Sequence, residues 1–211
     1  MRPRSSLPRM SPRERPSKRA WPRIEDVHTI VFDFDGVFTD NKVYIAEDGS
    51  EVVRCDRADG LGIDLLRAYG RRRRRTLDIL ILSRERNRVV QARARKLGLR
   101  SCQAVVDKLS FLQSYLRRRH PAVSDPFAGL LYAGNDLNDL PLIARAGFSV
   151  APADAHPLVR RTASAVLPIR GGEGFVRGVV ERLLGVSTMS AEEIYELVLD
   201  SGDRDQPQRR R

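Results

Sequence analysis

The stretch Ile30-Val31-Phe32-Asp33-Phe34-Asp35-Gly36-Val37-Phe38-Thr39-Asp40 is an apolar run that ends in two carboxylates with the spacing Asp-x-Asp. Residues 29–34 are apolar and partly β-branched, which predicts a short buried strand. Side chains alternate along a strand, so Asp33 and Asp35 would share a face if the strand continued through them. Two carboxylates held this close repel each other unless a cation or a shared proton relieves them. We therefore expect a chemical site here rather than a solvated turn.

Segments typical of strands alternate with segments typical of helices along the rest of the chain. The apolar patterns predict further strands at 77–82, 102–106, 129–132, 148–151 and 165–168. The helical spacings predict helices at 59–69 (with Gly70 as a stop), 84–97, 108–118, 156–162, 174–184 and 191–199, and one more that ends at Ala146. Asp48-Gly49 between the β-prone runs 42–46 and 51–54 predicts a hairpin. The predicted fold class is α/β: a doubly wound, Rossmann-like parallel sheet with helices on both faces and a β-hairpin flap after the first strand.

The formal net charge of +11 is concentrated at the N-terminus, where residues 1–23 carry a net +7. This segment is rich in Pro, Ser and Arg, so we expect a disordered basic leader, followed by a globular domain at 24–186 and a helix with a polar tail at 187–211. A second basic block at 71–75 is expected in a solvated connection. Neither block is interleaved with aromatic residues, which argues against nucleic acid as a partner.

The sequence gives no sign of a membrane segment or of export. No apolar run is long enough to cross a bilayer, and the N-terminus has no apolar signal region. Cys55 and Cys102 are the only cysteines and lack metal-ligand spacing. We expect a cytoplasmic protein without a membrane partner.

Four polar features follow predicted strands: the acid pair, Ser83, Lys108 and the segment 135–139. The carboxyl ends of strands in a doubly wound sheet meet at one crevice. Acids, a hydroxyl, an ammonium and an amide together suit phosphoryl transfer through a carboxylate nucleophile. Such a site needs Mg²⁺ to offset carboxylate and phosphate charge. Each residue alone has an ordinary explanation, such as a helix cap for Ser83, but the four in this order favour the chemical interpretation.

These segments resemble the four motifs of the haloacid dehalogenase superfamily over roughly residues 25–185. The resemblance implies that Asp33 attacks phosphorus and forms an aspartyl phosphate. It implies that Asp35 protonates the leaving alcohol and then deprotonates the hydrolytic water, while Ser83 and Lys108 bind the phosphoryl oxygens.

The resemblance also implies a magnesium site. Its ligands would be the Asp33 carboxylate, the Asp35 backbone carbonyl and the cluster that holds Asn135, Asp136 and Asp139. Many relatives carry Asp in place of Asn135, so the third direct ligand is left open among these three residues.

The insertions that form cap domains in other members of the superfamily are absent here. About 25 residues separate Ser83 from Lys108, enough for one helix and one strand. The stretch 105–109 and the turn at 171–174 are similar to capless phosphatases of keto-sugar-acid phosphates and to the phosphatase-like domain of acylneuraminate cytidylyltransferases. Glu85 is similar to the type that acts on nine-carbon nonulosonate 9-phosphates, and the eight-carbon 3-deoxy-octulosonate 8-phosphate is the alternative.

The substrate carboxylate calls for cationic partners, and Arg57, Arg161 and Arg177 are candidates beside Glu85. Surface solvation explains each arginine about as well. The resemblance suggests a homotetramer in which a neighbour's 42–54 hairpin covers the open crevice. Two other classes stay open: a non-catalytic oligomerisation or regulatory module linked to cytidylyl transfer, and an enzyme that acts on nucleic-acid ends.

Overall fold

The computed structural model describes residues 20–202, and its centre is a six-stranded parallel sheet in the order β5-β4-β1-β6-β7-β8. The strands are β1 (Thr29–Phe32), β4 (Asp78–Leu82), β5 (Arg100–Cys102), β6 (Leu130–Ala133), β7 (Phe148–Ala151) and β8 (Ala165–Val166). All four residues of β1 are buried, which explains why this strand is apolar throughout instead of alternating. The predicted parallel α/β sheet is confirmed.

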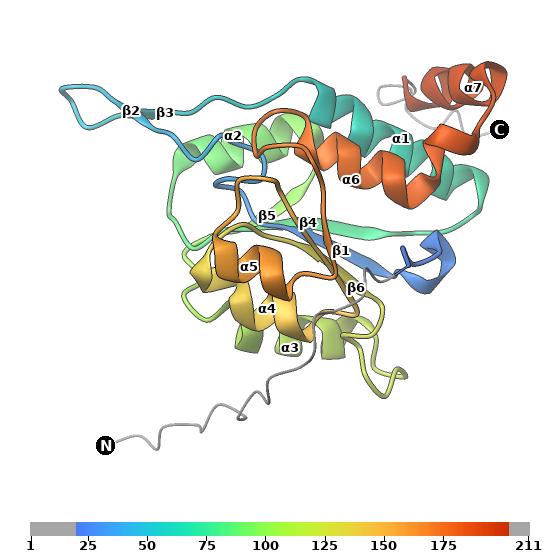
Figure 1. Ribbon diagram of the computed structural model, residues 1–211, viewed down its shortest axis with the longest axis horizontal. Helices are drawn as coiled ribbons and strands as arrows, with labels where there is room; N and C mark the ends of the chain where they lie inside the picture. The colour runs from blue at the N-terminus through green and yellow to red at the C-terminus, as the bar shows by residue number, and fades with distance from the viewer. Residues whose placement is uncertain (1–19, 203–211) are drawn as a thin grey trace, which may run out of the picture.

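Helices cover both faces of the sheet (Figure 1). On one face lie α1 (Ala58–Arg72), α2 (Arg88–Leu97), α6 (Phe175–Leu184) and α7 (Ala191–Ser201). On the other lie α3 (Lys108–Arg119), α4 (Leu140–Arg145) and α5 (Pro157–Thr162). Short 3₁₀ turns occur at Ile24–Asp26, Leu137–Asp139 and Val186–Thr188. Each face has its own apolar core, so the sheet is shielded from water on both sides.

The register of the three central strands determines where the polar residues lie. Phe32 of β1 pairs with Ile81 of β4 and with Ala133 of β6. The strands therefore end at nearly the same level, and the residues that follow them meet at one edge of the sheet.

The predicted hairpin is present as β2 (Tyr44–Ile45) paired with β3 (Glu51–Val52), and it projects from the body beside α2 (Figure 1). Its four strand residues are exposed. At its base, Thr39 forms an isolated bridge with Cys55. The hairpin is thus a two-stranded arm rather than part of the sheet.

Three predicted boundaries were wrong. Helix α1 does not stop at Gly70 but runs to Arg72, because Gly70 does not adopt the left-handed conformation that ends a helix; it is buried where a Cβ would lie 2.9 Å from the Arg75 carbonyl oxygen. Helix α2 begins at Arg88 instead of 84, since Asn87 caps it by accepting a hydrogen bond from the Val89 N–H. Strand β5 occupies 100–102, before most of the predicted range.

The basic block at 71–75 is only partly a connection. Arg71 and Arg72 belong to α1 and bind Asp200 at the end of α7. Leu197 of α7 is buried in the core of the same face. The C-terminal helix therefore packs on the domain, while the tail from 203 and the leader up to 19 lie outside the described residues.

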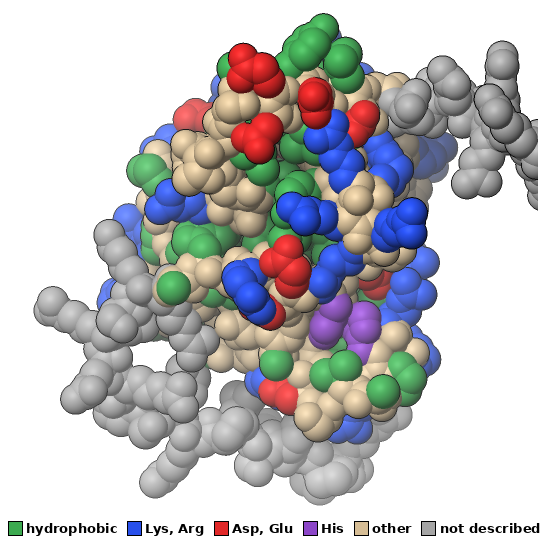
Figure 2. All heavy atoms as spheres, turned by 90° about the vertical axis from the view of Figure 1, so that its right-hand side faces the viewer, with side chains coloured by type: hydrophobic (Ala, Val, Ile, Leu, Met, Phe, Trp, Pro, Cys, Tyr) green, Lys and Arg blue, Asp and Glu red, His purple; other side chains and the backbone are tan. Residues whose placement is uncertain are grey.

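The face turned toward the viewer in Figure 2 includes two adjacent histidines, which are His28 and His120 with ring centroids 3.7 Å apart. Thr29, which opens β1, has its Oγ1 2.9 Å from His28 Nδ1 and 3.1 Å from His120 Nε2. The pair therefore marks the amino ends of the strands, opposite the edge that carries the acids. Cys55 and Cys102 are free thiols. No helix among residues 20–202 combines the length and apolarity of a membrane span.

Candidate active site

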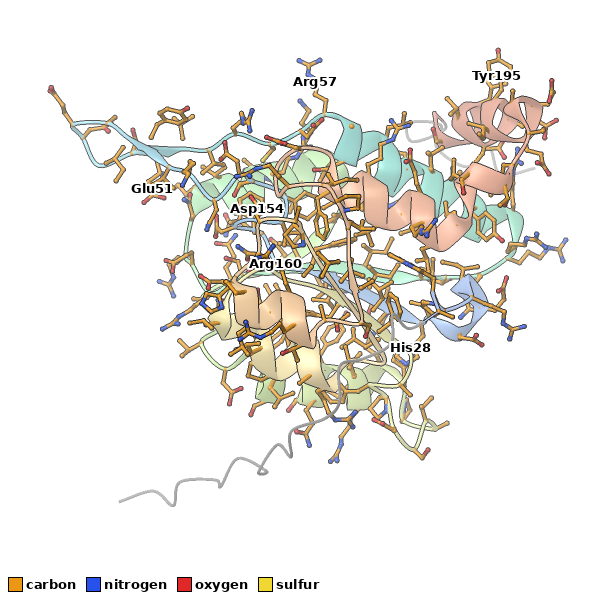
Figure 3. The ribbon with its side chains drawn as sticks, in the orientation of Figure 1. His28, Glu51, Arg57, Asp154, Arg160 and Tyr195 are labelled. Carbon is orange, nitrogen blue, oxygen red and sulfur yellow. The ribbon has the colours of Figure 1, made fainter. Side chains whose placement is uncertain are left out.

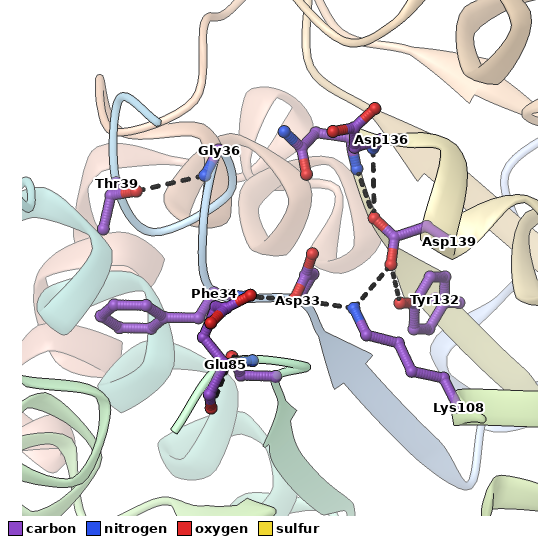
Figure 4. Close-up of polar contacts among 11 residues, drawn as sticks. Asp33, Phe34, Gly36, Thr39, Glu85, Lys108, Tyr132, Asp136 and Asp139 are labelled. Atoms are coloured by element: carbon purple, nitrogen blue, oxygen red, sulfur yellow. Dashed lines mark hydrogen bonds and ion pairs between the residues drawn. The ribbon is translucent and has the colours of Figure 1, made fainter. Parts of the chain in front are cut away.

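Asp33, Lys108 and Asp139 form a buried chain of charges at the carboxyl end of β1 (Figure 4). The Lys108 Nζ lies 2.9 Å from Asp33 Oδ1 and 2.7 Å from Asp139 Oδ1. Lys108 is the first residue of α3, which Asp107 caps by accepting from the Ser110 N–H. The start of α3 therefore places the ammonium next to Asp33, although the two residues are 75 positions apart in the sequence. This agrees with the prediction that Lys108 lies near the carboxyl ends of the strands.

Both oxygens of the Asp139 carboxylate accept hydrogen bonds from the protein. Its Oδ1 accepts from Lys108 and from the Tyr132 hydroxyl at 2.6 Å, and its Oδ2 accepts from the Asn135 and Asp136 N–H groups at 2.9 and 3.2 Å. Four charge-assisted hydrogen bonds hold this side chain in place. The arrangement fits Asp139 as an anchor for Lys108 and for the 135–136 turn rather than as a ligand open to an ion.

The buried charges shift each other's proton affinity. Burial raises the pKa of Asp33 well above its usual range, and the charge of Asp139 adds to this effect against the opposing charge of Lys108. Burial alone would lower the pKa of Lys108, but Asp33 and Asp139 outweigh it and raise that pKa. Two carboxylates share one ammonium, so the protein by itself leaves an excess negative charge that a cation would relieve.

Asp35 is half-buried and lies in the same cleft as Asp33. Burial raises the pKa of Asp35, and the negative charge of Glu85 raises it further. A carboxyl group with a raised pKa is suited to give and take a proton near neutral pH. The structure thus brings Glu85 to the cleft, next to the predicted acid.

Ser83 follows β4 and is buried beside the cleft. Its Oγ accepts from the Glu85 N–H at 3.1 Å, and its own N–H donates to the Cys102 carbonyl. The hydroxyl therefore shapes the turn that presents Arg84 and Glu85. The helix cap of the ordinary interpretation was wrong, because Asn87 and not Ser83 caps α2, while Ser83 lies at the position that the chemical interpretation requires.

Asn135 supplies a buried oxygen that has no partner in the protein. Its Oδ1 is buried without a hydrogen bond, while its backbone carbonyl accepts from the His156 N–H. The amide lies against Gly36, which has a φ of +73° and whose absent Cβ would be 1.9 Å from Asn135 Nδ2. Glycine is thus required on both counts, and it lets the Asn135 side chain approach the loop after Asp33.

A divalent cation fits this donor set. Carboxylate, amide and backbone carbonyl oxygens are the ligands that Mg²⁺ prefers. No group of three His, Cys, Asp or Glu side chains within residues 20–202 could hold a metal alone, so an amide or carbonyl oxygen would have to complete a site. The unpartnered Asn135 Oδ1 and the excess charge around Asp33 meet both needs.

The cleft around these residues has a volume of about 310 Å³. Asn138 also lines it and belongs to the predicted segment 135–139. No role was predicted from the sequence for its remaining lining residues, which come from the hairpin and its base and from the turn after β4: Asn41, Val43, Glu51, Arg84 and Asn87. Arg84 is the one cation among the described lining residues. In the sequence, its position directly after Ser83 could have indicated that Arg84 belongs to the site. Tyr132 was also missed, since a tyrosine inside an apolar strand looks like core.

The three predicted arginine partners are not brought to the cleft. Arg57 lies at the start of α1 and points away from the sheet (Figure 3). Arg161 lines a separate and larger hollow of about 1530 Å³ between β8, α5 and α6. Arg177 pairs with Glu181 at 2.6 Å on α6. Among the described residues, Arg84 is instead the arginine that lines the cleft.

The glycine turn at 171–174 packs against the loop that follows Asp33. A Cβ at Gly171 would lie 2.0 Å from the Gly36 carbonyl oxygen, and one at Gly172 would lie 2.3 Å from the Asp40 nitrogen. The Gly172 N–H donates to the Val37 carbonyl. Backbone packs directly on backbone here, which fixes the turn that follows Asp33.

No family model matches the chain. Among curated proteins, the 3-deoxy-D-manno-octulosonate 8-phosphate phosphatase KdsC of Yersinia pestis is 32% identical over 163 residues, which are 77% of this chain and 82% of that protein. A crystal structure of a 3-deoxy-D-manno-octulosonate 8-phosphate phosphatase from Yersinia pestis is similar to this fold, with a TM-score of 0.68.

Two further solved structures are informative. A candidate HAD family hydrolase from Streptomyces avermitilis MA-4680 is 41% identical, with a TM-score of 0.72 over 82% of this chain and 95% of its own. The octulosonate phosphatase of Moraxella catarrhalis, solved with a magnesium ion, a phosphate ion and KDO, is 25% identical, with a TM-score of 0.68 over 77% of this chain and 88% of its own.

Proposed function

This chain belongs to the capless phosphatases of the haloacid dehalogenase superfamily, and we propose that it hydrolyses the phosphomonoester of a keto-sugar acid in a Mg²⁺-dependent reaction. Its class is phosphoric monoester hydrolase. The observation that carries the proposal is the contact of Lys108 with both Asp33 and Asp139 beside the unpartnered Asn135 oxygen. This set unites a nucleophile, an ammonium and an ion-binding oxygen at one strand end.

Asp33 is the proposed nucleophile. Its Oδ1 already accepts from Lys108 and from the Phe34 N–H at 2.8 Å, so we assign the attack on phosphorus to Oδ2. The resulting aspartyl phosphate is hydrolysed in a second step. Asp35 gives its proton to the leaving alkoxide and then takes one from the attacking water.

The proposed magnesium site consists of the Asp33 carboxylate, the Asp35 backbone carbonyl and Asn135 Oδ1, with Asp136 at the cleft wall as a further ligand candidate. When bound, the ion offsets the negative charge of carboxylate and phosphate. Asp139 is proposed to position Lys108 instead, because its four hydrogen bonds use both oxygens.

For the sugar, we propose a nine-carbon nonulosonate 9-phosphate, supported by Glu85 at the cleft wall. A carboxylate there accepts hydrogen bonds from sugar hydroxyls. The relatives that act on the eight-carbon octulosonate 8-phosphate make that compound the second candidate. We assign recognition of the substrate's own carboxylate to Arg84, which can bind it in a bidentate manner.

We also propose that the enzyme assembles as a homotetramer whose hairpins cover neighbouring clefts. Val43, Tyr44, Ile45 and Val52 of the hairpin are 50–69% exposed. Such a group of large apolar side chains on a projecting arm favours contact with another subunit. A cytoplasmic location is part of the proposal, supported by the free thiols of Cys55 and Cys102.

A substrate panel with and without Mg²⁺ tests the proposal. It contains the nine-carbon 9-phosphate, the eight-carbon 8-phosphate, p-nitrophenyl phosphate and a 5′-phosphorylated oligonucleotide. The parent should hydrolyse the sugar-acid phosphates best, and Asp33→Asn should lose several orders of magnitude in turnover. Near-normal turnover by a clean Asp33→Asn preparation would refute the mechanism. A preference for the oligonucleotide, or no turnover at all, would favour one of the two other classes.

A further inference from the structure

The hairpin is joined to the wall of the cleft by one side-chain contact. Glu51, the first residue of β3, accepts a hydrogen bond through Oε2 from Asn87 Nδ2 at 2.5 Å. Both residues line the cleft that contains Asp33 (Figure 3 labels Glu51). Among residues 20–202, β2 and β3 make no other hydrogen bond or ion pair to the body of the fold.

Asn87 uses both ends of its amide. Its Oδ1 accepts from the Val89 N–H at 2.9 Å and so caps α2, while its NH₂ group holds Glu51. The cap fixes the rotamer of the amide, because the oxygen has to face the helix. The nitrogen is then directed at the hairpin at little further cost in conformational entropy.

We propose that Asn87 is a positioning residue that holds Glu51 in place as a sugar-binding wall of its own subunit's cleft. The inference rests on the proposed function, since a polyhydroxylated leaving group is what such a wall would bind. A carboxylate accepts hydrogen bonds from hydroxyls, and Oε1 of Glu51 is not used by Asn87. Phosphoryl transfer itself is assigned to other residues, so Glu51 acts on selectivity.

The hydrogen bond between Asn87 and Glu51 joins two segments that line the cleft. Glu51 and Val43 come from the hairpin, and Arg84, Glu85 and Asn87 come from the turn after β4. Without the contact, the two-residue strands would be tied only at their base, where Arg54 binds Asp40 at 2.9 Å. The position of Glu51 relative to the sugar would then vary.

Asn87→Asp separates the contact from the cap. Aspartate caps a helix as well as asparagine does, but it places a carboxylate opposite Glu51 and removes the donor. The ratio of kcat/KM for the sugar-acid phosphate to kcat/KM for p-nitrophenyl phosphate should fall on the order of tenfold, mainly through KM. Glu192→Gln, which removes one exposed charge from the first turn of α7 and leaves the hairpin intact, should leave this ratio unchanged.

The double variant Glu51→Gln/Asn87→Asp reverses the direction of the hydrogen bond, because the glutamine amide then donates to the aspartate. It should recover most of the KM that Asn87→Asp loses. Hydrogen exchange needs no substrate: amides of residues 43–52 should exchange faster in Asn87→Asp and return toward the parental rate in the double variant.

The outcomes separate the two proposals. A parent enzyme that prefers the sugar-acid phosphate, combined with an unchanged ratio and unchanged exchange in Asn87→Asp, would overturn the role of Asn87 alone. Absence of rescue in the double variant would also overturn it. A parent that shows no preference for sugar-acid phosphates would instead refute the proposed function, and the exchange data would still decide whether the contact holds the hairpin.

Discussion

At the scale of single residues, the two buried acids differ in the number of hydrogen-bond donors that contact them. Asp139 has four and Asp33 has two, both on one oxygen. A carboxylate with satisfied lone pairs is held rigidly, and one with a free oxygen can react. The difference assigns positioning to Asp139 and attack to Asp33.

Tyr132→Phe tests this positioning. Loss of the hydroxyl deprives the buried Asp139 of one donor, which should lower the free energy of unfolding by about 1.5–3 kcal/mol. It should also lower kcat by roughly tenfold, because Asp139 holds Lys108. The matched control is Tyr115→Phe, whose hydroxyl donates to Asp78 at the same distance of 2.6 Å but at the amino end of β4, opposite the edge that carries the cleft. Denaturant unfolding should detect both changes, whereas kcat falls in Tyr132→Phe only; equal kcat values would contradict the role.

Glu85→Ala tests the choice of sugar. The variant should lose on the order of 1–3 kcal/mol in kcat/KM for the nine-carbon 9-phosphate relative to p-nitrophenyl phosphate, the cost of an unmatched polar contact. Steady-state kinetics on both substrates measures the ratio. An equal loss on both would make Glu85 a general electrostatic residue, and a parent that prefers the eight-carbon 8-phosphate would reject the nine-carbon assignment.

At the scale of elements, helices α1 and α6 are joined by a buried acid. Asp59 of α1 accepts through Oδ1 from the Arg177 N–H in the first turn of α6 at 3.0 Å, while its Oδ2 is buried without a partner. The helices also approach closely, since a Cβ at Gly62 would lie 2.9 Å from the Arg177 Cα. Burial raises the pKa of Asp59 to about 7, and Asp56 adds to the shift.

The raised pKa predicts a stability that depends on pH. Because the folded pKa lies above that of the unfolded chain, the protonated carboxyl favours folding at low pH, and this contribution is lost as pH rises from about 4 to about 7. Asp59→Asn removes the titration and keeps an oxygen for Arg177. Its free energy of unfolding relative to the parent should rise by on the order of 1–4 kcal/mol between pH 4 and pH 8, measured by urea unfolding. A pH-independent difference would show that Asp59 does not titrate in this range.

At the scale of the whole molecule, the hairpin that lines the cleft also projects from the body, and the proposed assembly would bury its exposed side chains. Tyr44 and Ile45 are 67% and 69% exposed at the projecting arm. Replacing both by Ser should convert the proposed tetramer to smaller species, as measured by light scattering after size exclusion, because burial of these side chains would drive the contact.

Tyr195→Ser is the matched control for assembly. This tyrosine is 63% exposed but lies on α7, at the end of the molecule away from the hairpin (Figure 3). It should leave the assembly unchanged. A monomeric parent at micromolar concentration, or a double variant that still forms tetramers, would reject the proposed role of the hairpin.

Local sequence patterns were enough to predict the alternation of strands and helices, the hairpin, and the strand-end positions of Asp33, Ser83, Lys108 and Asn135. These follow from local periodicity and from the rule that parallel strands end at one edge. The start of α2 was misplaced although a local signal was present, since Asn87 is a residue type that caps helices. The run of α1 past Gly70 was missed because glycine is typical of a helix end, and local patterns do not show that the backbone stays helical there.

Which polar residues meet depends on the packing of the whole fold. It placed Arg84 in the cleft and Arg57, Arg161 and Arg177 outside it, because a charged side chain carries no periodic signal that tells a cleft from an open surface. It also paired Tyr132 with Asp139 and Glu51 with Asn87. Such pairs depend on the register of neighbouring strands and on the cap of a helix, and these are set by packing over the whole sheet.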